Sequence, residues 1–202
     1  MKRGCRVTFV HFHSVPYLPD ISRGKARALV ERLTAWQYVS RLYVVPFGEI
    51  QRAVVLAVPG PLRVVVYRRL MLRIATHLAK QEDAWALTTG DSLGQVASQT
   101  PENIAVVNEA TSLPVLRPLI GMDKLEITQQ AQALGSFETS IEPDQDCCTL
   151  FVPKHPQTRC HLPHILQIEQ DLDIPGLVQQ SLQRKELVTF SHAKHAKKEP
   201  SP

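Results

Sequence analysis

The sequence predicts an α/β protein, in which a parallel sheet is covered by helices on both faces. Short β-branched and aromatic runs alternate with longer segments whose apolar residues recur every three or four positions. The strand runs are apolar at successive positions, which is typical of parallel strands buried on both faces. Ligands of such sheets bind outside the carboxyl ends of the strands.

The first elements follow from this alternation. Residues 5–13 (CRVTFVHFH) predict a strand, and the proline-containing loop SVPYLPD ends it. An amphipathic helix is expected from Ser22, and residues 41–47 (RLYVVPF) predict a second strand. Two helices follow at 48–58 and 61–81, split by Pro59-Gly60-Pro61.

The second half continues the alternation. Residues 85–90 (WALTTG) and 114–119 (PVLRPL) predict strands, whereas 93–100 and 102–111 predict helices. A helix at 124–134 has Asp123 as N-cap, Glu126 three residues later and Gly135 beyond its end. Further elements are expected to be helical from 163 to 187 with a break at Pro175-Gly176, then a disordered stretch over the final dozen residues.

Composition excludes several classes of protein. The 202 residues are 44% hydrophobic and 21% charged, which is ordinary for one globular domain. No apolar stretch reaches the roughly 20 residues of a membrane span, and the N-terminus lacks a secretory signal, so we expect a cytoplasmic protein with reduced cysteines. The formal charge of +4 permits a polyanionic partner such as RNA without requiring one.

Three groups of polar residues could form binding sites. The turn at 88–100 (TTGDSLGQVASQT) places Gly90 and Gly94 where backbone amides can meet an anion, although such turns are more often ordinary connections. Arginines 68, 69 and 73 on the second long helix are expected to reach solvent, with a phosphate or RNA clamp as the alternative. His11 and His13 share one face of the first strand and favour a polar cleft or solvent over a metal.

The adjacent cysteines Cys147 and Cys148 are the strongest local signal, and three interpretations remain open for them. They could be inert buried thiols, or ligands of a zinc ion together with Cys160 and a histidine. The third is a reactive thiol, whose thiolate the nearby basic side chains of 154–159 would stabilise and whose acidic neighbours would oppose.

Three pairs of segments resemble the tRNA 4-thiouridine synthetase family, which is also linked to thiamine biosynthesis. They are VHFHSVPY with FGEIQ, YRRLMLRIA with TTGDSLGQVASQTPENI, and VLRPLIGMDKLEI with DQDCCTLFVPKHPQT. The resemblance spans residues 1–187, and it leaves 188–202 as a basic, disordered tail. It implies an adenine-nucleotide α-hydrolase-like (PP-loop) fold.

The resemblance also implies a reaction and its residues. ATP, with Mg²⁺, would adenylate O4 of a tRNA uridine, and a cysteine persulfide would then deliver sulfur to give 4-thiouridine. The family's ATP contacts match His11, Phe12, Arg68, Gly90 and Gln99. Its sulfur-carrying cysteine matches Cys148, with Cys147 as the close alternative. The implied partners are tRNA, a cysteine desulfurase or other persulfide donor, and a sulfur-carrier protein of thiamine thiazole synthesis; no membrane is implied, and whether the protein forms a homodimer stays open.

One family feature is absent from this sequence. In the family, a strand and an SGGxDS-type loop that cradles pyrophosphate precede the first strand found here, and RNA-binding modules lie further upstream. We therefore expect a chain truncated at its N-terminus. The alternative function is a non-catalytic nucleotide- or RNA-binding remnant.

Overall fold

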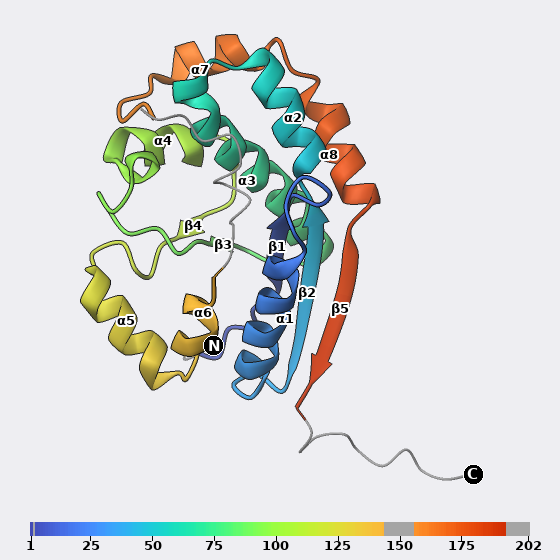
Figure 1. Cartoon of the computed structure of the whole chain (residues 1–202), viewed down its shortest axis with the longest axis vertical. Helices are drawn as coiled ribbons and strands as arrows, with labels where there is room; N and C mark the ends of the chain where they lie inside the picture. Colours follow the sequence, from blue (N-terminus) through green and yellow to red (C-terminus); the bar gives the residue numbers. More distant parts are fainter. Residues whose placement is uncertain (2, 144–155, 193–202) are drawn as a thin grey trace.

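A computed structural model describes residues 1, 3–143 and 156–192 of the chain (Figure 1). Its five strands are β1 (Phe9–His13), β2 (Val39–Pro46), β3 (Leu87–Thr88), β4 (Val115–Leu116) and β5 (Glu186–Ser191). Its helices are α1 (Ile21–Thr34), α2 (Gly48–Ala57), α3 (Arg63–Gln81), α4 (Pro101–Asn108), α5 (Lys124–Ala133), α6 (Phe137–Ile141), α7 (Leu162–Glu169) and α8 (Ile174–Gln183). Short 3₁₀ turns lie at Gly60–Leu62 and Ala97–Gln99. None of the described helices is long and apolar enough to cross a membrane.

The strands form two separate sheets. One has the order β1-β2-β5, with β1 and β2 parallel and β5 antiparallel to β2; the other is the parallel pair β3-β4. The α/β fold with parallel strands is therefore confirmed. Strand β5, which the sequence did not predict, adds an antiparallel edge, because the chain turns back directly after α8 and runs along the edge of β2.

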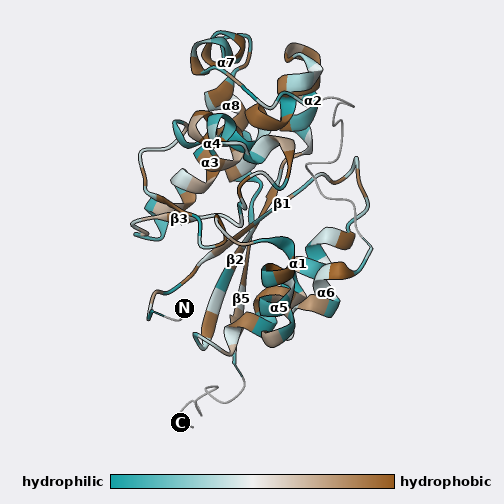
Figure 2. Ribbon diagram, turned by 90° about the vertical axis from the view of Figure 1, so that its left-hand side faces the viewer, coloured by the Kyte–Doolittle hydropathy of each residue, from teal (hydrophilic) through white to brown (hydrophobic). Residues whose placement is uncertain are grey.

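Strand β2 is buried on both faces, as the unbroken apolar run predicts. Leu42 and Val44 face one way and pack with Val30 of α1, whereas Tyr43 and Val45 face the other way, into the main core. Alternation along the strand produces this division. Figure 2 shows α1 with α5 and α6 in one group, and α2, α3, α4, α7 and α8 in another.

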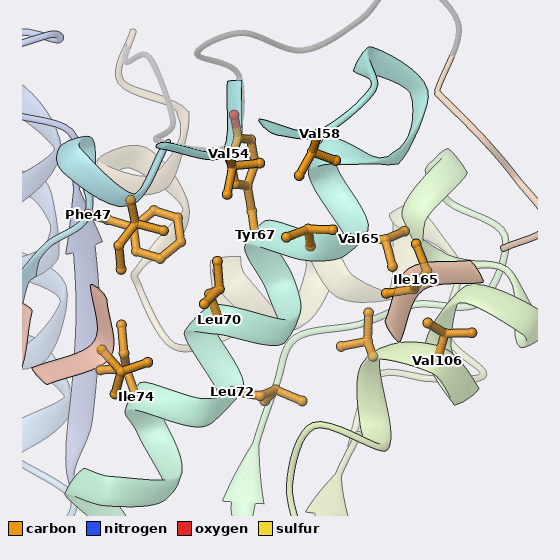
Figure 3. Packing of buried hydrophobic residues seen from close by; sticks show 14 of the residues in the cluster. Phe47, Val54, Val58, Val65, Tyr67, Leu70, Leu72, Ile74, Val106 and Ile165 are labelled. Atoms are coloured by element: carbon orange, nitrogen blue, oxygen red, sulfur yellow. The ribbon is translucent and has the colours of Figure 1, made fainter. Parts of the chain in front are cut away.

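The main core is built around α3, which contacts α2, α4 and α8. Leu70 and Ile74 are fully buried on this helix, and Figure 3 shows them near Phe47. Tyr67 stacks edge-on against Phe47, with ring centroids 6.1 Å apart. Helix α3 therefore ties the sheet to the outer helices, and it carries residues 68, 69 and 73 on its other faces.

Several local predictions need correction. Residues 93–100 do not form a regular helix; only a 3₁₀ turn forms, and Thr100 caps α4 instead by accepting a hydrogen bond from the Asn103 amide. Between α7 and α8 the break comes before Pro175, which lies in the first turn of α8 because proline suits a helix start. The predicted tail is wrong for residues 188–191, which belong to β5 and place Val188 and Phe190 against the α1 side of the sheet.

The capping prediction for α5 is confirmed. Asp123 accepts from the Glu126 amide at 2.9 Å, and the Glu126 carboxylate accepts from the Asp123 amide at 2.8 Å. This reciprocal pair satisfies two amides that the helix cannot bond internally. Gly135 follows the helix with φ +66°, which a glycine adopts without strain.

Candidate functional site

A cavity of about 900 Å³ lies between β1 and β3. Its walls include Phe9, Val10 and Phe12 of β1 on one side and Leu87 and Thr88 of β3 on the other. Within the described residues β1 pairs only with β2, and β3 pairs only with β4, so the edges of the two sheets face each other across this space (Figure 1). The volume is within the range of sites for drug-sized ligands and cofactors.

One side of the cavity is apolar and rigidly built. Met71, Leu72 and Ala75 of α3 line it. Phe12 also lines it, and its ring packs edge-on against Phe47, with centroids 5.4 Å apart. Such a wall accepts a flat apolar or aromatic group, because aromatic side chains contribute large contact areas at fixed positions.

The polar end of the cavity is organised around Asp91, whose side chain is 6% exposed. Arg68 of α3 donates to Oδ1 of Asp91, and Arg117 donates from Nε to Oδ2 at 3.1 Å. The Thr89 hydroxyl donates to Oδ2 at 2.8 Å, and Gln99 Nε2 lies 3.4 Å from Oδ1. Two arginines therefore share one carboxylate, which leaves a net positive charge at this end of the cavity.

The loop after β3 positions these groups by its backbone. Gly94 has φ +73°, and its amide donates to the Gln99 carbonyl at 2.9 Å, which closes the loop before α4. Gly90 lines the cavity, and a methyl group added there would come no closer than 4.0 Å to the nearest protein atom, on Leu119. No packing contact with the described part of the chain therefore requires a glycine at 90, which is consistent with space kept for a ligand.

The structure brings together three of the five residues predicted to contact ATP: Phe12, Arg68 and Gly90 all line the cavity. Gln99 joins them through Asp91. His11 lies on the other face of β1, where Nε2 is 3.2 Å from the hydroxyl of Ser22 in α1. ATP contacts at all five positions remain a prediction.

His13 shares a face with His11 and is buried. Burial, reinforced by the charge of Arg23, lowers the pKa of His13. Its Nδ1 accepts a hydrogen bond from the Val15 amide at 3.3 Å, which requires a neutral ring. The expected cleft or solvent position is therefore wrong for His13, which is a structural residue at the end of β1.

The arginines of α3 differ from the expectation that they reach solvent. Arg69 is 0% exposed and donates through Nε and Nη2 to Glu169 of α7, at 2.8 and 3.1 Å. It also bonds the Val106 carbonyl and Glu109. Arg73 holds the same Glu169 carboxylate through both terminal nitrogens, at 2.8 and 2.7 Å. Only Arg68 of the three lines the cavity.

This buried network sets the charge state of its carboxylate. Burial alone would raise the pKa of Glu169, but hydrogen bonds from Arg73 and Arg69 outweigh it and lower that pKa. For Arg69, burial opposes the charged form, and the hydrogen bonds and charges of Glu169 and Glu109 outweigh it, so its pKa is raised. Both pKa shifts favour the charged forms of Glu169 and Arg69.

Cys147 and Cys148 lie outside the described residues, so their three interpretations stay open. Cys160 is described and buried, and burial raises its pKa, which opposes a thiolate. Among the described residues no group of three His, Cys, Asp or Glu side chains is close enough to hold a metal ion.

The chain that follows the cysteine segment is held against α4 by side-chain hydrogen bonds, most of them from Asn103. Asn103, fully buried, donates to the carbonyls of Ala97 and Gln157 at 2.8 and 2.9 Å and accepts from the Cys160 amide at 2.9 Å. The Thr100 hydroxyl adds a bond of 2.6 Å to the Thr158 carbonyl. Residues 157–160 and the loop that ends at Gln99 therefore share one anchor.

Sequence reasoning missed Asp91 and Arg117. Each directly follows a short strand or its turn, Asp91 after TTG and Arg117 after Val115–Leu116. The carboxyl ends of neighbouring parallel strands lie at the same edge of a sheet. The position of both residues just after a predicted strand could therefore have indicated that they lie together.

Comparisons with known proteins identify the family of this chain. A family model described as "Thiamine biosynthesis protein (ThiI)" matches residues 1–174. A probable tRNA sulfurtransferase of Thermus thermophilus is 53% identical over 191 residues, which are 95% of this chain and 47% of that protein. One of Nocardia farcinica is 46% identical over 189 residues, covering 94% of this chain and 46% of that protein.

The chain is also similar to a crystal structure described as a 4-thiouridine synthetase–RNA complex with bound ATP. The TM-score is 0.90 at 36% identity, and the match covers 94% of this chain and 50% of the other. The chain spans about half the length of the curated relatives it matches. These matches confirm the resemblance and the fold class: the chain belongs to the ThiI family, in which the matched relatives are named probable tRNA sulfurtransferases and the similar structure a 4-thiouridine synthetase.

Proposed function

We propose that this chain is the ATP-binding and sulfur-transferring part of a tRNA uridine 4-sulfurtransferase. The observation that supports this most is the cavity between β1 and β3, where Phe12, Arg68 and Gly90 meet. The similar solved structure is an RNA complex with bound ATP, and it shares this fold along 94% of the chain. The base of ATP would take the apolar wall, and its phosphates would take the positive end.

The reaction would begin with adenylation. O4 of the tRNA uridine attacks the α-phosphorus of ATP, the bond to the β-phosphate breaks, and pyrophosphate leaves. Adenylation turns O4 into a leaving group. The terminal sulfur of a persulfide on Cys148 then attacks C4, and AMP departs with O4. A second thiol cleaves the sulfur–sulfur bond by attacking the cysteine sulfur, which leaves the terminal sulfur on the base.

We propose that the cavity is completed by a strand and an SGGxDS-type loop supplied from upstream in the full-length relatives. The facing edges of β1 and β3 support this, because among the described residues neither edge is paired with a further strand. The loop would add backbone amides for the pyrophosphate, because the Thr89 amide at this end of the cavity already donates to the Leu116 carbonyl at 3.0 Å.

The described residues do not fit a Mg²⁺ site at the polar end. Asp91 is the carboxylate there, and two arginines already occupy it. Glu82, which also lines the cavity, is bound by Arg41, Tyr43 and Thr8. No step of the reaction is therefore assigned to a metal held by these residues.

The sulfur would come from a cysteine desulfurase or another persulfide donor, and the same persulfide could serve a sulfur-carrier protein of thiamine thiazole synthesis. The family's description supports the link to thiamine, and the names of the relatives support tRNA. If Cys148 carries sulfur for both routes, Cys148→Ser stops both, whereas Cys147→Ser stops neither.

The decisive experiment joins this chain to the upstream half of the Thermus thermophilus relative. We expect the joined protein to exchange radiolabelled pyrophosphate into ATP in the presence of tRNA, and to form 4-thiouridine when a persulfide donor is added. Absence of both activities refutes the assignment. ATP binding without exchange or thiolation would instead support the nucleotide-binding remnant.

A further inference from the structure

We propose that Asp91 is a positioning residue, which holds Arg68 in place for the phosphates of a nucleotide without contacting them itself. Asp91 directly follows Gly90, and its side chain is 6% exposed at the polar end of the cavity. This role rests on the proposed function for the identity of the ligand.

Arg68 keeps donors for a ligand while it is bound to Asp91. Its Nη2 donates to Oδ1 of Asp91, and its Nη1 donates to the Ser98 carbonyl at 2.7 Å. A guanidinium has five N–H groups, so these two bonds leave one on each terminal nitrogen and the one on Nε. They fix the plane of the guanidinium and leave it able to bind phosphate in the cavity that it lines.

The carboxylate of Asp91 is itself held from its other side. The Thr89 hydroxyl donates to Oδ2 at 2.8 Å, and Arg117 donates to the same oxygen from Nε at 3.1 Å. The side chain of Asn108 and the carbonyl of Val115 hold Arg117 in turn, at 3.2 and 3.3 Å. Asp91 cannot rotate without breaking these bonds, so helix α3, the turn after β3 and the end of β4 meet at one fixed point.

The chemistry of a carboxylate determines that Asp91 acts through its donors. An ionised carboxylate only accepts hydrogen bonds, and its charge repels the phosphates of a nucleotide. Oδ1 accepts from Arg68 and lies 3.4 Å from Nε2 of Gln99, and Gly90 is the preceding residue of the chain. Asp91 therefore adjoins three of the five residues predicted to contact ATP, and its strongest bond among them is the one to Arg68.

Holding Arg68 in advance should raise the affinity for the ligand. A mobile arginine side chain loses rotamer freedom when it binds, which lowers affinity by roughly twofold to tenfold. In this protein the bonds to Asp91 and to the Ser98 carbonyl already impose that order. Displacing the Asp91 carboxylate should therefore cost affinity although no atom of Asp91 meets the ligand.

The test changes the length of the Asp91 side chain and keeps its charge. In the joined protein, Asp91→Glu moves both oxygens by one methylene group and should weaken ATP binding, measured by calorimetry, by about five- to tenfold. Thr89→Val removes one bond to Oδ2 at nearly constant volume and should weaken binding by about threefold. This milder change decides the question if the longer side chain disturbs folding.

A second background separates positioning from general support of the loop. Both losses should disappear when Arg68→Gln is already present, because Asp91 then has no guanidinium to position. Losses of the same size in both backgrounds would overturn the proposal, since they would show that Asp91 supports the loop independently of Arg68.

Glu169→Asp is the matched control. Glu169 is also a buried carboxylate held by two arginines, and both of them come from the same helix as Arg68. The substitution changes the side-chain length by one methylene group at constant charge, away from the cavity. It should lower the free energy of unfolding and leave ATP affinity unchanged. A loss of affinity as large as that of Asp91→Glu would overturn the proposal, because damage to any buried ion pair would then weaken binding.

The two proposals fail in different ways. Wild-type protein that binds ATP, with unchanged affinity in Asp91→Glu and Thr89→Val, refutes the positioning role and leaves the function intact. Wild-type protein that does not bind ATP refutes the proposed function, and titration of the same variants with inorganic pyrophosphate then decides whether Asp91 positions Arg68 for an anion. Absence of pyrophosphate binding as well overturns both.

Discussion

Replacement of Arg69 by methionine tests whether the arginines of α3 are structural. Arg69 is fully buried, and the substitution removes two bonds to Glu169, one to the Val106 carbonyl and one to Glu109. Removing one member of a buried ion pair costs about 3–5 kcal/mol. Arg73 still neutralises Glu169 after the change, so we expect the lower end, about 3 kcal/mol.

Arg73→Met provides the internal comparison. Its side chain is 21% exposed and, within the described ranges, bonds only Glu169, which Arg69 continues to hold, so we expect a loss of about 1–2 kcal/mol. Urea unfolding followed by circular dichroism gives both values, and an unchanged slope against urea shows that the unfolded states are comparable. The Arg69→Met loss should appear as a fall in Tm of about 6–12 °C. A loss below about 1 kcal/mol at Arg69, or a larger loss at Arg73, refutes the reasoning.

Three further predictions concern the site and its surroundings. Gly90→Ala should leave the free energy of unfolding within about 0.5 kcal/mol of wild type, because no atom of the described residues crowds the position. It should nevertheless weaken ATP binding measured by calorimetry, and unchanged affinity would place the nucleotide elsewhere. Because the pKa of His13 is lowered, its contribution to the free energy of unfolding is complete above about pH 6.5 and is lost as the pH falls through the folded-state pKa. Between about pH 7.5 and 5.5 the free energy of unfolding should therefore decline less in His13→Asn than in wild type. An equal decline in the two proteins contradicts this. Cys148→Ser should abolish 4-thiouridine formation in the joined protein and spare ATP binding, and loss with Cys147→Ser instead would move the sulfur to Cys147.

Periodicity predicted the long elements well, and tertiary contacts decided the rest. Helix α3 and strand β2 were predicted because their apolar residues recur over many positions. Strand β5 has exposed residues at alternate positions and adjoins a basic end, so its pairing with β2 was not visible in the sequence. The two-residue strands β3 and β4 were found chiefly because a glycine turn and prolines frame them.

The candidate site likewise contains residues that the sequence indicated and residues that only tertiary contacts reveal. The resemblance indicated Phe12, Arg68 and Gly90, which the fold brings to one cavity. It did not indicate Asp91 or Arg117, because their importance comes from a contact between residues 26 positions apart. Sequence spacing alone also could not show that Arg68 lines the cavity whereas its neighbour Arg69 is directed at α7.

The amide of Asn103 has a consequence for how two distant segments of the chain move. One planar group holds both the carbonyl of Ala97, beside the loop proposed to meet ATP, and the backbone at 157 and 160, directly after the cysteine segment. A shift of either of these two segments strains the hydrogen bonds between Asn103 and the other. The positions of the loop that ends at Gln99 and of residues 157–160 therefore depend on each other through the single amide of Asn103.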